Sequence, residues 1–219
     1  GALPYDVGIY YIAVALTLCG PVSGIRAFGK KAPEHQAQLL YEEEPEAVWQ
    51  IPGNNLVSAA LEFESGAIGS VLFDGNTTSS VQHGFTVFGT KGILKIGDPN
   101  RFDGETRLIL PNSEEMVVPF THGYDGTNLI GEKQWYDAYG DRGIGVAEMA
   151  WALRMKRKNN RCSKEYGLHC MEVLLGIDEA AATGETYQPH SRFHMDPLEC
   201  GYYSKDGIGR GDAERSLMY

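Results

Sequence analysis

Hydrophobic residues recur with a helical period at both ends of the chain and alternate with polar residues in between. Residues 7–19 are apolar at nearly every position, and they lie between Asp6 and the pair Gly20-Pro21. Asp6 is a good N-cap, because its carboxylate can accept the free N–H groups of a first turn, and Gly followed by Pro is a typical helix end. We therefore expect an initial helix that is buried on more than one side. It is too short to span a bilayer.

The middle of the chain predicts antiparallel strands. Residues 22–31 alternate as one strand, and residues 38–41 indicate another short one. Paired alternating segments joined by short turns predict three hairpins: 55–64 with 67–73, 85–88 with 93–96, and 107–110 with 116–120. Successive strands joined this closely form an antiparallel sheet.

Helical spacing returns after residue 143. Residues 144–153 carry apolar ridges, and Ser163 is a candidate N-cap for a second helix that ends at Thr183-Gly184. The buried stripe expected on this second helix is Tyr166, Cys170, Val173, Leu174, Ile177 and Ala181.

This order of elements indicates an α+β fold, an open, predominantly antiparallel β-sheet with helices packed on one face. We expect one substrate-binding and oligomerisation domain over residues 1–190. Residues 191–219 are polar and rich in glycine, so we expect them to form a C-terminal arm or tail.

Charge and cysteine content narrow the possible partners. The net charge of −10 argues against nucleic acid and anionic membranes as ligands, since both need basic surfaces. The four cysteines show no Cys-x-x-Cys spacing, which favours a reducing, cytoplasmic location over a disulfide framework.

Asp6 and Tyr10 are the first candidates for chemistry. Four residues apart on a helix, they would lie on one face, where a carboxylate and a phenol can form a proton-transfer pair. The positive end of the helix dipole favours anions there. The alternative is that Asp6 only caps the helix and Tyr10 only packs.

The segment Asp6-Val7-Gly8-Ile9-Tyr10-Tyr11, followed by Leu18-Cys19-Gly20-Pro21-Val22, resembles the start of the C-terminal domain of the Gfo/Idh/MocA oxidoreductases. Its Asp-x-x-x-Tyr pattern is similar to the glucose–fructose oxidoreductase and dihydrodiol dehydrogenase branches, whereas most members carry Asp-x-x-x-His. Three further segments resemble the family in the same order: 88–104, 142–150 and 182–185.

The resemblance implies an NAD(P)-dependent dehydrogenase or reductase that acts on a sugar, polyol or related carbonyl. Tyr10 would be the acid/base and Asp6 would orient the substrate or the tyrosine. NAD or NADP would be bound mainly by an N-terminal Rossmann domain that this chain lacks, with a lysine of that domain beside Tyr10. We expect this fragment alone to be inactive, and we expect a homodimer or tetramer formed through the free sheet face.

Four further residues are candidates for substrate binding. Arg101 and Arg142 lie in predicted loops, and a guanidinium fork suits vicinal hydroxyls or a phosphate. His122 and Trp135 lie on a long predicted loop of the kind that often lines sites. For each of the four, a solvated or structural role is the alternative.

Other functional classes fit the sequence less well. His190 and His194 have zinc-like spacing, but Pro189 and the polar tail argue against a helix there. Gly143-x-Gly145 follows a polar loop and not a strand, so a nucleotide loop is not expected there. A non-catalytic assembly or ligand-sensing module of the same fold remains the alternative to an enzyme.

Overall fold

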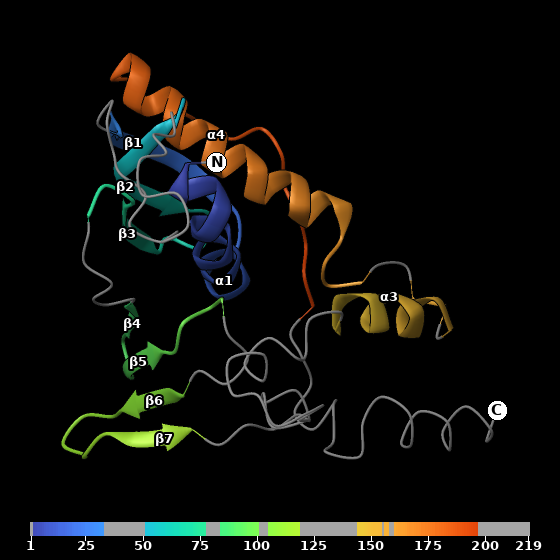
Figure 1. Cartoon of the computed structure of the whole chain (residues 1–219). Helices are drawn as coiled ribbons and strands as arrows, with labels where there is room; N and C mark the ends of the chain where they lie inside the picture. Colours follow the sequence, from blue (N-terminus) through green and yellow to red (C-terminus); the bar gives the residue numbers. More distant parts are fainter. Residues whose placement is uncertain are drawn as a thin grey trace, which may run out of the picture. The chain divides into compact units, whose positions relative to one another are not determined.

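The computed structural model forms two compact units (Figure 1). It describes residues 2–32, 51–77, 84–100, 105–118, 144–154, 156–157 and 160–196. The first unit comprises residues 1–82 and 163–195, and the second comprises residues 83–162 and 196–219.

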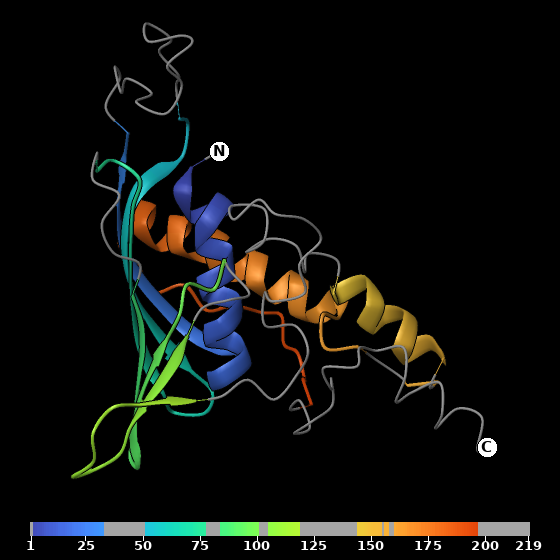
Figure 2. The ribbon, with the colours of Figure 1, turned by 60° about the horizontal axis from the view of Figure 1, so that its bottom comes forward.

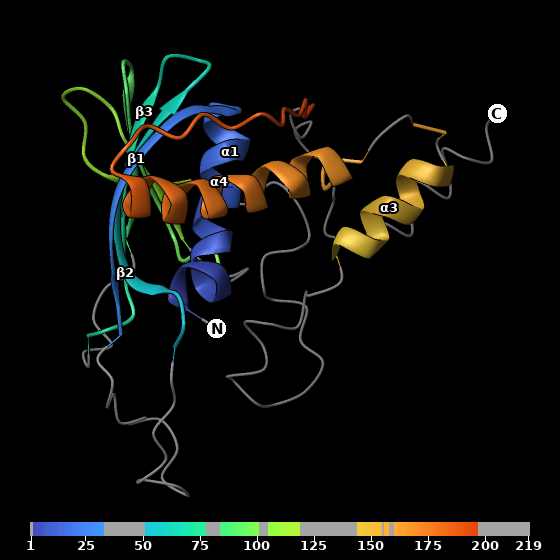
Figure 3. The ribbon, with the colours of Figure 1, turned by 90° about the horizontal axis from the view of Figure 1, so that it is seen from above.

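The first unit is a three-stranded sheet covered by two helices. A short π-helix, η1 (Pro4–Gly8), continues into α1 (Ile9–Cys19). Strands β1 (Val22–Lys31), β2 (Asn54–Phe63) and β3 (Ile68–Asp74) pair antiparallel in that order. Helix α4 (Lys164–Thr183) and α1 lie on the same face of this sheet, and none of the described helices or strands of this unit covers the other face (Figures 2 and 3).

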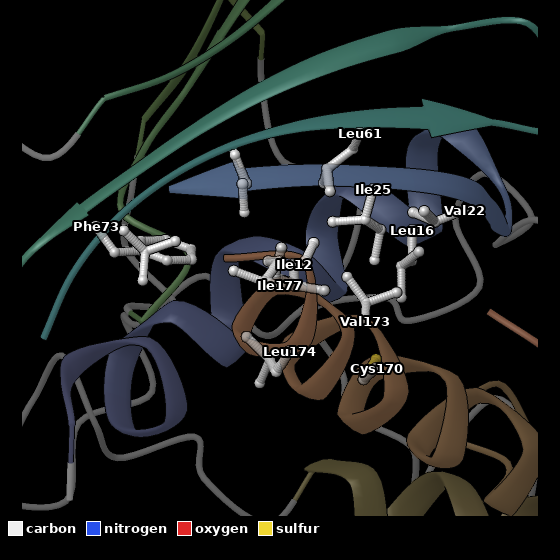
Figure 4. Packing of buried hydrophobic residues seen from close by; sticks show 14 of the residues in the cluster. Ile12, Leu16, Val22, Ile25, Leu61, Phe73, Cys170, Val173, Leu174 and Ile177 are labelled. Atoms are coloured by element: carbon white, nitrogen blue, oxygen red, sulfur yellow. The ribbon is translucent and has the colours of Figure 1, made fainter. Parts of the chain in front are cut away.

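Strand alternation decides which side chains reach the core. Successive strand residues point to opposite faces, and β2 is buried at every second position. The inward side chains of the three strands meet α1 and α4 in one cluster (Figure 4). Its members include Ile12, Leu16, Val22, Ile25, Val57, Leu61, Phe73, Cys170, Val173, Leu174 and Ile177. The stripe expected on the second long helix is confirmed, although Ala181 is only partly buried.

The helix ends also follow the sequence. Gly20 ends α1 with a φ of 83° and donates its N–H to the Leu16 carbonyl at 2.9 Å. Ser163 Oγ accepts the Tyr166 N–H at 3.2 Å and caps α4. Gly184 closes α4 in the left-handed conformation, which glycine adopts without strain.

Residues 187–195, which we call the strap, return along α4. Tyr187 exchanges both backbone hydrogen bonds with Ile25 of β1, at 2.9 and 3.0 Å. The Phe193 ring meets the Tyr166 ring edge-on at 5.1 Å, and Met195 packs against the core. Residues 191–195, which we expect to belong to the C-terminal arm or tail, thus contact the first unit, and residues 197–219 lie outside the described residues.

The second unit holds a four-stranded antiparallel sheet in the order β4-β5-β6-β7. Its strands are β4 (Phe85–Gly89), β5 (Gly92–Ile96), β6 (Thr106–Ile109) and β7 (Met116–Val118). The unit also contains α3 (Ile144–Arg154). The α+β class, the antiparallel pairing and all three hairpins are confirmed, with the described strands divided between two sheets. The short strand expected over 38–41 lies outside the described residues.

Two features bear on the earlier expectations about cysteines and membranes. Cys19, Cys162 and Cys170 carry free thiols, and Cys170 is buried in the core. None of the described helices has both the length and the hydropathy that a bilayer span requires.

Candidate functional site

The candidate site lies where η1 joins α1. The helical run begins before Asp6, because Pro4 occupies the first helical turn and the Asp6 N–H already donates to the Ala2 carbonyl at 3.3 Å. The expectation that Asp6 is the N-cap is therefore wrong. Proline at the first turn loses no helical hydrogen bond, so the helix can start three residues upstream of the polar signal that we used.

The π turn is itself a functional indication. π-Helical turns are rare, and they occur frequently at functional sites. In this turn the backbone bonds run from i to i+5 and not from i to i+4, so regular α spacing holds only from Ile9 onward. Asp6 is exposed within the π turn, and Tyr10 is half-buried in the first turn of α1.

Tyr5, which the sequence analysis missed, anchors the π turn to α4. Its hydroxyl donates to Asp178 Oδ2 at 2.5 Å, and the other carboxylate oxygen accepts Asn54 Nδ2 at 2.8 Å. Burial, and then the hydrogen bond to Asp178 and its charge, raise the pKa of Tyr5 well above its ordinary value. Tyr5 is therefore held as a neutral donor, and this excludes it as the general base of the site.

A buried amide fixes the start of the run. Asn55 is only 2 % exposed, and its Oδ1 accepts the Leu3 N–H at 2.9 Å. Its Nδ2 donates to Asn76 Oδ1 at 2.9 Å, so both ends of the amide are satisfied. Leaving either end of this buried amide without a partner would lower the stability of the fold. The hydrogen bond therefore fixes the position of the Leu3 backbone.

Close packing fixes the other end of the turn. A Cβ on Gly8 would lie 2.9 Å from the Phe73 ring, a distance that real side chains do not tolerate. Gly8 therefore lets η1 approach β3 closely. Contacts to β2, β3 and α4 thus hold the π turn immediately before Tyr10.

The sequence gives little indication of these anchors. Tyr5 and Asp178 are 173 positions apart. Asp178 follows the buried Ile177 on α4 and looks like an ordinary solvated residue in a sequence pattern. Tyr5 next to Asp6 was the only local indication, since two polar side chains at a helix start need partners.

The other predicted site residues lie outside the described residues: Arg101, His122, Trp135 and Arg142. Of the six candidates, the structure places Asp6 and Tyr10 on one continuous helical run. No group of three or more metal-ligating side chains occurs among the residues that the structure describes.

Comparison with known proteins gives one family model and several solved structures with a similar fold. Residues 1–95 match the family model described as the GFO/IDH/MocA C-terminal domain. No curated protein matches the sequence at a significant level.

Solved structures share the fold at low sequence identity. An NAD binding oxidoreductase from Klebsiella pneumoniae is 19% identical with a TM-score of 0.63, and the match covers 86% of this chain and 50% of that one. Levoglucosan dehydrogenase in complex with NADH and levoglucosan is 18% identical with a TM-score of 0.62, covering 85% and 50%. An oxidoreductase from Agrobacterium radiobacter in complex with NAD+, L-tartaric acid and magnesium is 16% identical with a TM-score of 0.59, covering 84% and 48%.

The chain spans about half the length of these structures. The family match covers residues 1–95, which is less than half of the 219 residues, so the similarity to the GFO/IDH/MocA C-terminal domain holds for that part of the chain.

Proposed function

We propose that this chain is the substrate-binding and oligomerisation domain of an NAD(P)-dependent oxidoreductase that acts on a sugar, polyol or related carbonyl. The observation that carries the proposal is Tyr10, half-buried in the first turn of α1 and directly after an anchored π turn. The ligands of two structural neighbours, levoglucosan and L-tartaric acid, support the substrate class.

Tyr10 is assigned the proton-transfer step. Oxidation of a carbinol breaks an O–H and a C–H bond, and Tyr10 takes the hydroxyl proton as general base. A cation beside a phenol favours the phenolate, and the family resemblance supplies a lysine from an upstream domain. Asp6, exposed one turn earlier, orients the substrate or the tyrosine.

The nicotinamide cofactor is assigned to a Rossmann domain outside this chain. The described strands pair antiparallel, and no strand–glycine loop–helix unit of the dinucleotide-binding kind occurs among them. The residues that the structure describes therefore do not fit the nucleotide by themselves, and we derive no step through it. When bound, the cofactor accepts or donates the hydride.

The proposal is tested in the full-length enzyme. Tyr10→Phe should lower kcat by about 10²–10⁴-fold in NAD(P)-linked assays on a panel of aldoses, polyols and sugar acids. Tyr11→Phe removes the neighbouring hydroxyl and serves as the matched control, with kcat unchanged. Equal turnover in Tyr10→Phe and the parent protein would exclude Tyr10 as the acid/base.

The uncovered sheet face supports a second part of the proposal, assembly of identical subunits. Phe28, Leu72 and Ile68 are 83%, 70% and 82% exposed on strands β1 and β3. Phe28 and Leu72 both lie opposite Ser58 of β2, so a small residue separates two large apolar ones. An exposed apolar surface of this kind is typical of an interface, and a two-fold dimer or a tetramer would bury it.

The double variant Phe28→Asp/Leu72→Asp should convert the assembly to a monomer in sedimentation velocity experiments. Leu168→Asp, at an exposed position of α4, is the control and should leave the mass unchanged. If this domain serves only assembly, the double variant will still dissociate the protein, but Tyr10→Phe will leave kcat of the full-length protein unchanged.

A further inference from the structure

A series of hydrogen bonds centred on the buried His169 holds the strap, and the proposed reaction does not use them. His169 of α4 is fully buried, and its Nε2 lies 2.9 Å from the Val22 backbone nitrogen of β1. Its Nδ1 lies 2.9 Å from Ser191 Oγ of the strap. One imidazole therefore joins a helix, a strand and the strap.

The donor and acceptor in each of these hydrogen bonds follow from the bond between Val22 and His169. A backbone N–H can only donate, so Nε2 of His169 must be the unprotonated nitrogen and must accept from Val22. Nδ1 then carries the ring proton and donates to Ser191 Oγ. The Ser191 hydroxyl proton is thereby left for Glu172 Oε2, with which it makes a short contact.

Glu172 completes the hold on the strap. Its two oxygens also accept the backbone N–H groups of His190 and Ser191, at 2.7 and 2.8 Å, and the Tyr187 hydroxyl at 3.3 Å. Phe193 covers the imidazole, with its ring centroid 5.5 Å from that of His169.

A proton on His169 would break this arrangement at its centre. Both ring nitrogens of an imidazolium donate, so Nε2–H would face the Val22 N–H with no acceptor between them. Both groups are buried, and an unsatisfied buried donor carries its full desolvation cost.

We propose that the strap is an acid-released latch: residues 187–195 stay on α4 and β1 while His169 is neutral, and they detach when His169 takes up a proton. The latch is independent of the proposed redox function. Release uncovers the imidazole and frees Phe193 and Met195 from the core, just before the chain passes into the second unit at residue 196.

The charged groups that face His169 set the pH range. Glu172 on α4, Arg192 on the strap and Glu64 at the end of β2 act on the ring with opposing signs. Burial, the largest cause, lowers the pKa of His169 below its ordinary value of 6.5. The hydrogen bonds from the strap lower the pKa of Glu172 to about 2, although burial opposes them. The latch should therefore open below pH 6.5, while Glu172 still carries its charge.

The test is an NMR titration of this chain between pH 7.5 and 4. Long-range ¹H–¹⁵N spectra report the tautomer and charge of His169, which is assigned with His169→Gln. The Met195 methyl reports the strap, and the Ile177 methyl reports the core. We expect an Nδ1–H tautomer at pH 7.5, and then loss of the packed Met195 signal in the same step as His169 protonation, with Ile177 unchanged.

Two variants sharpen the titration. Gln at position 169 keeps an acceptor for Val22 but cannot titrate, so the Met195 signal should stay packed through the step. Ser191→Ala removes two hydrogen bonds that hold the strap, to His169 and to Glu172. The closed strap is then less stable, so it should detach at a higher pH than in the parent protein.

Three results would each overturn the latch. They are an Nε2–H tautomer at pH 7.5, a Met195 signal that stays packed while His169 protonates, and loss of Ile177 together with Met195. All three measurements are made on the parent chain, and if His169→Gln fails to fold, nuclear Overhauser contacts with the Phe193 ring assign the His169 signals.

Discussion

Two carboxylates of α4 each bind one terminal segment of the first unit: Asp178 binds the π turn, and Glu172 binds the strap. The groups that they bind differ in chemistry. Asp178 accepts hydrogen bonds from the phenol of Tyr5 in the π turn and the primary amide of Asn54 in β2. Glu172 binds the strap through backbone N–H groups, a serine and, through that serine, the buried His169. One end depends on a phenol that must keep its proton, and the other depends on groups that must stay deprotonated.

This difference predicts opposite responses to pH. The pKa of Tyr5 is raised in the fold, so its contribution to stability is complete below pH 10 and is lost as the pH rises above that value. The pKa values of Glu172 and His169 are lowered, so their contributions are lost as the pH falls. The contacts that anchor the candidate site should therefore be lost at high pH, and those that hold the strap should be lost at low pH.

The largest effect is expected from Glu172→Gln. The variant keeps one accepting oxygen in place of two, so either the His190 N–H or the Ser191 N–H faces an NH2 group, and the free energy of unfolding should fall by roughly 3 kcal/mol. Asp178→Asn, which affects two partners, should cost about half as much. Urea unfolding measures both, with the exposed Glu179→Gln as control; a cost no greater than that of the control would contradict the role of Glu172.

The next largest effect is expected from a larger side chain at Gly176, which lies against the Tyr187 ring of the strap. A Cβ on Gly176 would lie 2.3 Å from the Tyr187 ring, so Gly176→Ala should lower the unfolding free energy by about 1–2 kcal/mol despite the better helix propensity of alanine. Gly167→Ala on the same helix meets nothing within 4 Å and should stabilise by up to about 1 kcal/mol. Equal shifts in melting temperature would show that Tyr187 does not pack as described.

The pH dependence of stability separates the two ends directly. Between pH 4.5 and 2, Glu172 should account for a loss of roughly 1–2 kcal/mol, after allowance for solvent screening. Tyr5→Phe should lower stability by about 1 kcal/mol at pH 7 and weaken the loss above pH 10, with the acid limb unchanged. Chemical unfolding at a series of pH values measures both limbs, and an acid limb altered by Tyr5→Phe would mean that the ends are coupled.

The smallest effect is expected at the surface of the strap. Arg192 pairs with Glu64, but both side chains are 44% exposed. Arg192→Met should therefore change the unfolding free energy by at most about 0.5 kcal/mol, and the change should disappear in high salt. A larger loss that persists in high salt would show that Arg192 holds the strap through its hydrogen bonds to the Pro189 and Ser191 carbonyls, and not only through the exposed ion pair.

The sequence predicts local features well because they depend on neighbouring residues. The hairpin turns, the Ser163 cap and the Gly20 and Gly184 helix ends all follow from short-range hydrogen bonding and backbone preference. The prediction that Asp6 is the N-cap is wrong because a capping residue type can also lie inside a helical turn when tertiary contacts extend the helix. The links from Tyr5 to Asp178 and from His169 to Ser191 join distant segments, so no local pattern encodes them.

The single bridge between Ile25 and Tyr187 has a consequence for aggregation. Strand β1 lies at the edge of its sheet, and an unpaired strand edge can recruit strands from other molecules. Both backbone groups of Ile25 that face this edge are already bonded to Tyr187. The strap therefore shields the middle of an otherwise adhesive edge, and protein stored in acid should be most prone to form intermolecular sheets along β1.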